Sequence, residues 1–388
     1  MPSLLSIPQE VRDHIIELVI LHEHDPPAEP TFDDTTGMLL EPDVDDILDQ
    51  ASLRYQRQPV NANATSLLLT NRSLHNETKA IVARLFPDGM RYNLDVMYIN
   101  DSALWPTWIS IPAVANHLAS INVTFRTFRY EMSAREKQSY SSWQGSDGWP
   151  PLIVFSFYRL LKNFLLIGPA PLRDKDRRRR QYSTKLIHLN FVSPEAEHVK
   201  YQRRAAPKST KQLASRLSDR LQSLTSMSYH EANYGAFIHE RIGRFEYTVD
   251  GEYLGEQDIG RVIASLQWYK PEHTFGDLPS TCRLPTFWNW KEQAIYKRRR
   301  FGLHTPAPIV WPGWEEFRHL LVEAEDHHKE MRREGRSALQ CMCYGRTLWR
   351  KLQRQQVGDG GNVRLPAQTS TEVKSLIAGG GIEESIAT

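Results

Sequence analysis

The sequence lacks most of the signals that mark secreted, membrane-embedded or disulfide-stabilised proteins. It has only 3 cysteines in 388 residues, too few for a disulfide scaffold, and this scarcity favours a reducing compartment. No apolar run of about 18 residues, the length that crosses a bilayer, occurs anywhere. Pro8, Gln9 and Glu10 interrupt the apolar stretch at the N-terminus, so we expect no signal peptide. These absences predict a cytoplasmic or nuclear protein without a membrane partner.

The motifs of common enzyme classes are also missing. The chain has no Gly-x-Ser-x-Gly, no phosphate-binding loop, no dinucleotide-binding glycine pattern and no His-Glu-x-x-His. His319, Glu323 and His327 recur every four residues, but no further metal ligand can be assigned to them. Cys341 and Cys343 lack a second cysteine pair. We therefore predict no catalytic residue, no metal and no cofactor, with an enzyme assembled from distant residues as the least favoured alternative.

Charge is balanced over the whole chain but segregated along it. The net charge is +2, with 40% hydrophobic and 24% charged residues, which is ordinary for globular proteins. Residues 22 to 50 include ten Asp or Glu and no Lys or Arg, whereas residues 173 to 211 include twelve Lys or Arg against four Asp or Glu. The acidic stretch also contains several prolines, so it predicts a mobile surface loop.

Two basic tetrads are candidates for binding an anion or a nucleic acid, or for nuclear import. The first spans residues 177–180, and the second consists of Lys297, Arg298, Arg299 and Arg300. The second is the better candidate because Tyr296 and Phe301 flank it, and nucleic-acid readers combine aromatic with basic side chains. The simpler alternatives are a solvated loop or a docking site for the acidic stretch.

Two amphipathic helices are predicted near the N-terminus. Ser6 and Gln9 fit a capping box, and Pro8 suits the first helical turn. The apolar stripe of the first helix consists of Ile7, Val11, Ile15, Leu18 and Val19, widened by Ile16 and Ile20. The second helix is predicted from Thr65 or Ser66 to the turn at 87–89, with a stripe of Leu67, Leu74, Ile81, Val82 and Leu85. Stripes of this size need a partner surface.

The same two segments resemble a known family. Segment 7–15, Ile-Pro-Gln-Glu-Val-Arg-Asp-His-Ile, resembles the Leu-Pro-x-Glu-Ile-Arg-x-x-Ile start of F-box-like domains in filamentous fungi, including the two-EXR families. Segment 68–78, Leu-Leu-Thr-Asn-Arg-Ser-Leu-His-Asn-Glu-Thr, is similar to their later Leu-Leu-x-Cys-Arg-x-x-x-x-Glu-Ala helix. Asn71 and Thr78 stand at the family's Cys and Ala positions, and the insert from 22 to 64 is longer than the usual link.

The resemblance implies a protein-interaction module. An F-box grips a Skp-type adaptor of a cullin-type ubiquitin ligase and thereby recruits a target protein, here unknown. The residues implied as adaptor contacts, or as the packing that presents them, are Ile7, Pro8, Val11, Ile15 and Leu18. The alternative is a structural or binding protein with no ubiquitin link, contacting nucleic acid through Lys297 to Arg300.

The middle of the chain predicts a mixed sheet covered by helices. Alternating apolar residues predict strands at 92–98 and 121–127, and a continuous apolar run predicts a central strand at 186–192. Asp250-Gly251 joins the two strands of a predicted hairpin. Helices are predicted at 153–166, 208–226 and 258–268.

The fold class is therefore α+β, with F-box-like helices at the N-terminus, a mixed α/β sheet body and C-terminal helices. The expected domains are 1–86 with the acidic insert 22–64, 87–310, 311–357, and a disordered tail at 358–388.

Overall fold

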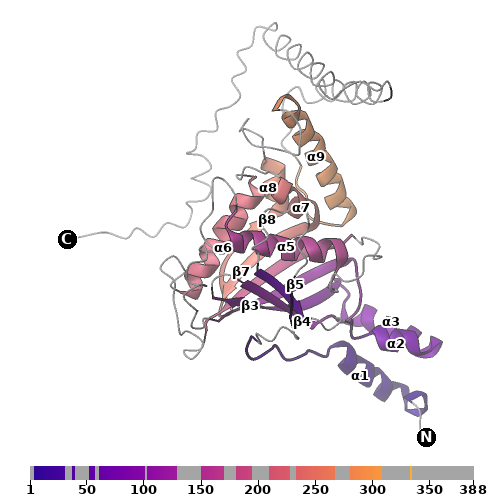
Figure 1. The fold of residues 1–388 in the computed structure, drawn as a ribbon. Helices are drawn as coiled ribbons and strands as arrows, with labels where there is room; N and C mark the ends of the chain where they lie inside the picture. Colours follow the sequence, from indigo (N-terminus) through magenta and orange to yellow (C-terminus); the bar gives the residue numbers. More distant parts are fainter. Residues whose placement is uncertain are drawn as a thin grey trace. The chain divides into compact units, whose positions relative to one another are not determined.

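The computed structural model describes residues 4–30, 37–39, 52–56, 61–100, 103–128, 150–169, 181–194, 209–227, 233–266, 280–307 and Arg333. The chain divides into two compact units, residues 1–309 and 310–388. All described residues except Arg333 belong to the first unit, which contains N-terminal helices followed by a sheet with covering helices (Figure 1). The predicted α+β class is therefore confirmed.

The sheet of the first unit is mixed and has the strand order β1-β2-β4-β3-β5-β6-β7-β8. Its centre is parallel, because β3, β5, β6 and β7 run in one direction. The strand β4 is antiparallel to β3, and β8 is antiparallel to β7. The strand bounds are β1 Gly37–Leu39, β2 Ser52–Gln56, β3 Met90–Ile99, β4 Ala103–Ser110, β5 His117–Phe128, β6 Ser183–Val192, β7 Ile242–Val249 and β8 Glu252–Asp258.

Alternation along the strands places the main core on one face of the sheet. The other face is more polar and also holds a small buried apolar cluster of Met97, Ile99, Trp105 and Phe128. Leu94, Val123 and Leu189 lie side by side in the register and are buried in the main core. Helices α5 (Leu152–Ile167), α6 (Thr210–Thr225) and α7 (Asn233–Arg241) supply its covering layer, visible in front of the sheet in Figure 1. On the polar face Asn122 donates to Asn93 at 2.9 Å. The apolar face therefore makes the main core.

The N-terminal helices are a short 3-10 turn η1 (Leu4–Ser6), α1 (Gln9–Ile20), α2 (Thr65–Thr70) and α3 (Arg72–Leu85). They join the body through the chain that follows β4. The backbone N–H of Asn63 donates to the Ile111 carbonyl at 2.8 Å, and that of Ala64 donates to the Pro112 carbonyl at 2.9 Å. After β8, the chain continues into α8 (Ile259–Ser265) and α9 (Ser280–Arg300).

Three sequence-based expectations about the elements need correction. The single helix predicted from residue 65 is two helices, because Asn71 has an extended backbone (φ −160°, ψ 168°) and caps α3. The acidic insert contains the strands β1 and β2 rather than loop alone. The sequence pattern also fails to predict β4, which contains Pro106. Only Ala103 and Leu104 of β4 pair with β2, so the missing N–H of Pro106 costs no hydrogen bond to β2.

No helix in the described ranges is long and apolar enough to cross a membrane.

Candidate functional site

The internal contact of the N-terminal helices is a narrow stripe of α1. Arg12, Ile16 and Ile20 recur every four residues and are buried, with both isoleucines at 0% exposure. The buried residues of α3 that pack in the same small core are Leu74, Thr78 and Ile81. Ala64 and Ala113 close this core toward the body. The two helices are thus held together by few apolar side chains.

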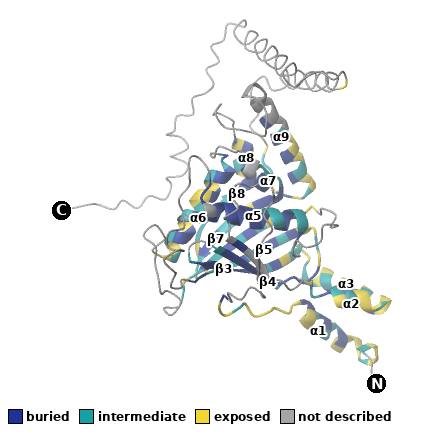
Figure 2. Ribbon diagram, in the orientation of Figure 1, coloured by how far each residue is buried: buried dark blue, intermediate teal, exposed yellow. Residues whose placement is uncertain are grey.

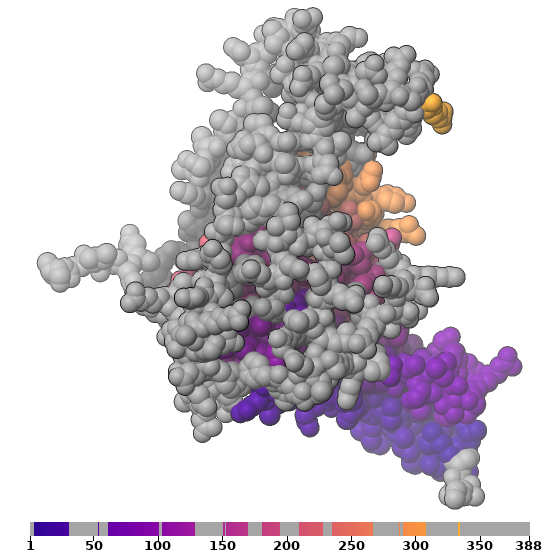
Figure 3. All heavy atoms as spheres, in the orientation of Figure 1, coloured from indigo at the N-terminus to yellow at the C-terminus, as the bar shows by residue number. Residues whose placement is uncertain are grey.

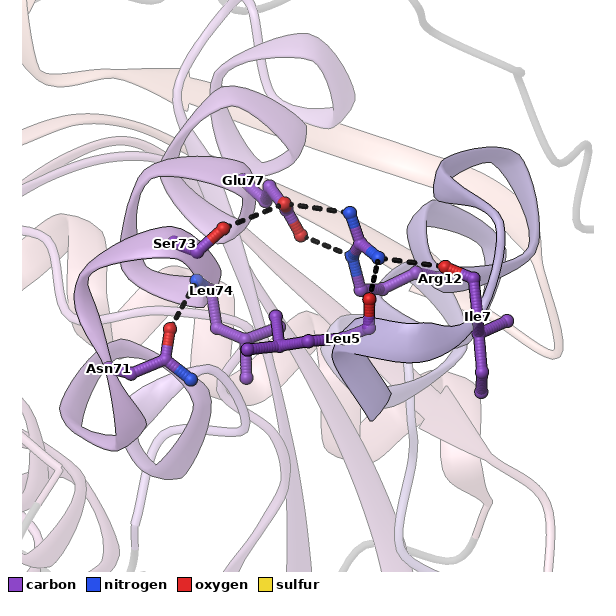
Figure 4. Close-up of polar contacts among 7 residues, drawn as sticks. All are labelled: Leu5, Ile7, Arg12, Asn71, Ser73, Leu74 and Glu77. Atoms are coloured by element: carbon purple, nitrogen blue, oxygen red, sulfur yellow. Dashed lines mark hydrogen bonds and ion pairs between the residues drawn. The ribbon is translucent and has the colours of Figure 1, made fainter. Parts of the chain in front are cut away.

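An ion pair completes this internal contact (Figure 4). Nε of Arg12 donates to one carboxylate oxygen of Glu77 at 2.6 Å, and Nη2 donates to the other at 2.9 Å. Nη1 of Arg12 donates to the Ile7 carbonyl at 2.9 Å, and the hydroxyl of Ser73 donates to Glu77 at 3.2 Å. Such a two-pronged pair fixes orientation as well as distance.

Arg12 and Glu77 come one from each of the two segments that resemble F-box-like domains. The hydrogen bond from Arg12 lowers the pKa of Glu77, partly opposed by burial, and the bond from Ser73 lowers it further. The same pair raises the pKa of Arg12. Both residues belong to the segments singled out in the sequence, but the sequence does not predict that they pair. They are 65 residues apart, and their contact depends on how α3 packs against α1.

Asparagine side chains set the ends of these helices. Oδ1 of Asn71 accepts from the Leu74 backbone N–H at 3.0 Å, which caps the start of α3. Nδ2 of Asn63 donates to the Ile20 carbonyl at 3.0 Å and to the His22 carbonyl at 2.7 Å, so it ties off the end of α1. The two ends of the insert are therefore hydrogen-bonded to each other, next to the end of α1.

A second apolar stripe of α1 faces outward. Val11 is 50% exposed and Leu18 is 59% exposed, while Ile15 between them is half-buried. Among the implied adaptor contacts, Pro8 is also exposed and Ile7 is half-buried. Figure 2 shows this mixture of exposed and buried positions on α1, against the dark core of the sheet. Within the widened stripe, the internal contact is therefore made by Ile16 and Ile20, while Val11 and Leu18 stay exposed.

A groove of about 700 Å³ lies beside this outer stripe. Its lining residues come from α1, from both ends of the insert and from the start of α2: Ile15, Leu18, Val19, His22, His24, Asn61, Ala62, Asn63, Thr65 and Ser66. The rings of His22 and His24 meet edge to face with centroids 4.9 Å apart. In the view of Figure 3 this N-terminal region forms a visible surface at the lower right, in indigo and purple. An apolar groove beside exposed apolar side chains is typical of a protein-docking surface.

The second basic tetrad does not form one cationic surface. Arg298 is 0% exposed, and its Nη1 donates to the carbonyls of His239 at 2.6 Å and Ile242 at 2.7 Å. Lys297 pairs with Glu240 at 2.8 Å. Only Arg299 and Arg300 are fully exposed, because successive residues of a helix point in different directions. Arg298 is therefore removed from the predicted anion-contact set as an internal residue.

Buried basic groups near α7 and α9 are a feature that sequence patterns miss. Nζ of Lys291 donates to the carbonyls of Ala264 at 3.0 Å and Leu266 at 2.8 Å. Burial lowers the pKa of Lys291 to about 8 and that of Arg298 to about 10. Burial likewise lowers the pKa of His239 to about 4, with the positive charges of Arg298 and Lys291 adding to the shift. Each of these groups is buried and hydrogen-bonded to a backbone carbonyl.

Other sequence-based candidates fall outside the described ranges. These are the first basic tetrad at 177–180, the histidine and glutamate series at 319–327, and the cysteines at 341 and 343. Within the ranges that are described, no group of three or more His, Cys, Asp or Glu side chains could hold a metal ion.

Comparisons with protein-family models, with curated proteins and with solved structures found no match. The resemblance to F-box-like domains therefore rests on the quoted segments alone.

Proposed function

We propose that this chain is an F-box-like interaction protein whose N-terminal helices dock a Skp-type adaptor, making it a candidate recruiting subunit of a cullin-type ubiquitin ligase. The observation that carries the proposal is the outward stripe of α1. Ile16 and Ile20 make the contact of α1 with its own core, whereas Val11 and Leu18 are about half exposed and lie outside that core. Apolar side chains left outside beside a groove are stabilised when a partner covers them.

The internal ion pair supports the same reading. Arg12 and Glu77 hold α1 and α3 together, so the outer stripe is presented on a fixed support rather than on a lone helix. Rigid presentation reduces the ordering cost of binding. The motif residues therefore divide into two roles: Arg12 and Glu77 position the helices, while Val11, Ile15 and Leu18 would contact the adaptor.

The test is binding of the full chain to a purified Skp-type adaptor. We expect the double variant Val11→Asp/Leu18→Asp to lose binding, because two charges would be buried against an apolar partner. Val114→Asp is the matched control, since Val114 is 55% exposed in the loop before β5 and does not line the groove. Binding that is absent in the wild type, or equal in the wild type and the double variant, would remove the adaptor role.

A second candidate is a binding protein with no ubiquitin link that contacts nucleic acid through α9. Arg299 and Arg300 are exposed there, and Tyr296 on the same helix is 68% exposed. Two free arginines give a small electrostatic footprint. A salt-dependent shift of a DNA or RNA probe, lost in Arg299→Glu/Arg300→Glu, would favour this function over adaptor docking.

A further inference from the structure

The strand β8 ends the sheet with an open edge. It pairs with β7 on one side, and no described strand pairs with its other side. Its side chains are exposed or half-buried along the whole strand. A Cβ added at Gly255 would meet nothing within 4 Å. An edge of this kind offers a row of backbone N–H and C=O groups to an extended peptide.

An acidic and aromatic patch lies on this edge. Tyr253 is 63% exposed. In the register with β7, Tyr253 lies opposite Thr248 and Glu256 lies opposite Glu246, so Tyr253, Glu256 and Glu246 share one face of the sheet. Partial desolvation raises the pKa of Tyr253, and the negative charges of Glu256 and Glu246 raise it further. Among the described residues, Arg244 lies 3.8 Å from each of these carboxylates and is half exposed, so its ion pairs with them are weak. A positively charged side chain would therefore find two carboxylates and a ring face together.

A second copy of this chain is a poor occupant of the edge. Antiparallel self-pairing centred on Gly255 would place Glu252 directly opposite Asp258. Like charges directly opposite one another across two strands are destabilising. The charge of the edge instead suits a strand that carries Lys or Arg at alternate positions.

We propose that β8 binds an extended basic peptide by strand addition, with a Lys or Arg side chain of the peptide lying against Tyr253 and Glu256. The backbone of β8 would supply the main-chain hydrogen bonds, and the acidic patch would select for positive charge. The strand order places this edge four strands away from β3, which packs against the N-terminal helices. The site is independent of adaptor docking. If both hold, a basic segment of the target is what the chain recruits.

The probe is a fluorescein-labelled peptide of five Lys-Thr repeats, titrated with the full chain and followed by fluorescence polarisation. Whichever face the lysines take, their alternation matches the period of a strand. The first control peptide replaces each Lys by Glu. The second keeps the lysines but carries a methyl group on every backbone amide, so it retains the charge and loses the donors that strand addition needs.

The expected result is saturable binding of the Lys-Thr peptide and no binding of either control peptide. Glu256→Lys should weaken binding about tenfold or more by turning attraction into repulsion. Asp88→Lys is the charge-matched control variant, since Asp88 is exposed in the turn before β3, and it should leave the affinity unchanged.

Three outcomes would overturn the proposal. The first is a wild-type chain that does not bind the Lys-Thr peptide. The second is an amide-methylated peptide that binds equally well, which would show charge attraction without a strand. The third is equal binding by wild type and Glu256→Lys. None of these depends on whether the adaptor binds, so failure here and failure of the proposed function are distinguishable.

Discussion

The N-terminal helices and the sheet body differ in which large side chains they expose and which they bury. Six of the nine exposed large apolar side chains among the described residues belong to the N-terminal segment: Leu5, Val11, Leu18, Val19, Leu21 and Leu69. The body instead buries charged groups, with Lys291 and Arg298 almost fully enclosed and bonded to backbone carbonyls. The difference indicates that the N-terminal helices present an apolar surface suited to a partner, whereas the described part of the body keeps most of its large apolar side chains inside.

The largest expected effect concerns the buried arginine of the body. Arg298→Ala should lower the free energy of unfolding by about 4 kcal/mol, because the carbonyls of His239, Ile242 and His304 lose their donor and a cavity remains. Arg299→Ala, one residue along the same helix and exposed, should change it by less than about 0.5 kcal/mol. Urea unfolding measures both. Equal effects would show that the two arginines occupy similar surroundings.

The second comparison lies within α1. Ile16→Ala should cost about 3 kcal/mol of stability, since Ile16 is 0% exposed in the small core against α3. Leu18→Ala should cost less than about 0.5 kcal/mol, because Leu18 is 59% exposed. Thermal unfolding of both variants tests which stripe is internal. If Leu18→Ala cost more stability than Ile16→Ala, the internal contact of α1 would lie on the stripe of Val11, Ile15 and Leu18.

The third prediction concerns pH and the body. The pKa of His239 is about 4 in the folded chain and close to 6.5 in an unfolded one. The unfolded state therefore binds more protons between these two values, so stability falls as pH drops from 6.5 to 4, by about 3 kcal/mol in all. His239→Gln should flatten this part of the pH profile of urea unfolding. A profile as steep as that of the wild type would assign the loss to other groups.

The smallest expected effect compares two buried threonines. The hydroxyl of Thr78 in the N-terminal core has no hydrogen-bond partner, so Thr78→Val should stabilise the chain by about 1 kcal/mol. The hydroxyl of Thr225 in the body donates to the Leu221 carbonyl at 3.0 Å and accepts from Gln257, so Thr225→Val should destabilise it by a similar amount. Differential scanning calorimetry would distinguish the two signs, and a shift in the same direction would contradict the assignment.

Local pattern predicts much of the body but little of the N-terminal contact. Alternation predicts β3 and β5, a continuous apolar run predicts β6, and Asp250-Gly251 predicts the β7–β8 hairpin, because these patterns are local signals. Periodicity finds the apolar residues of α1 but does not tell which of them face α3, because the internal row begins with Arg12. That position reads as polar until Glu77 is known to lie opposite.

The burial of Arg298 within the basic tetrad is missed for a related reason. A run of four cations reads as surface, yet a helix turns one member in four inward, and Arg298 finds three carbonyl groups there. The α9 helix itself is missed because its sequence, with Pro285 and several aromatic residues, has little helical periodicity. Non-local partners decide both cases, and no single-sequence pattern contains them.

The most direct test of the central claim is hydrogen–deuterium exchange of the full chain with and without a purified Skp-type adaptor. The account predicts slower exchange in α1 and in residues 61–70, with β7 and β8 unchanged. Unchanged exchange in α1, or protection confined to the sheet, would contradict the claim that the outer stripe of α1 is a docking surface.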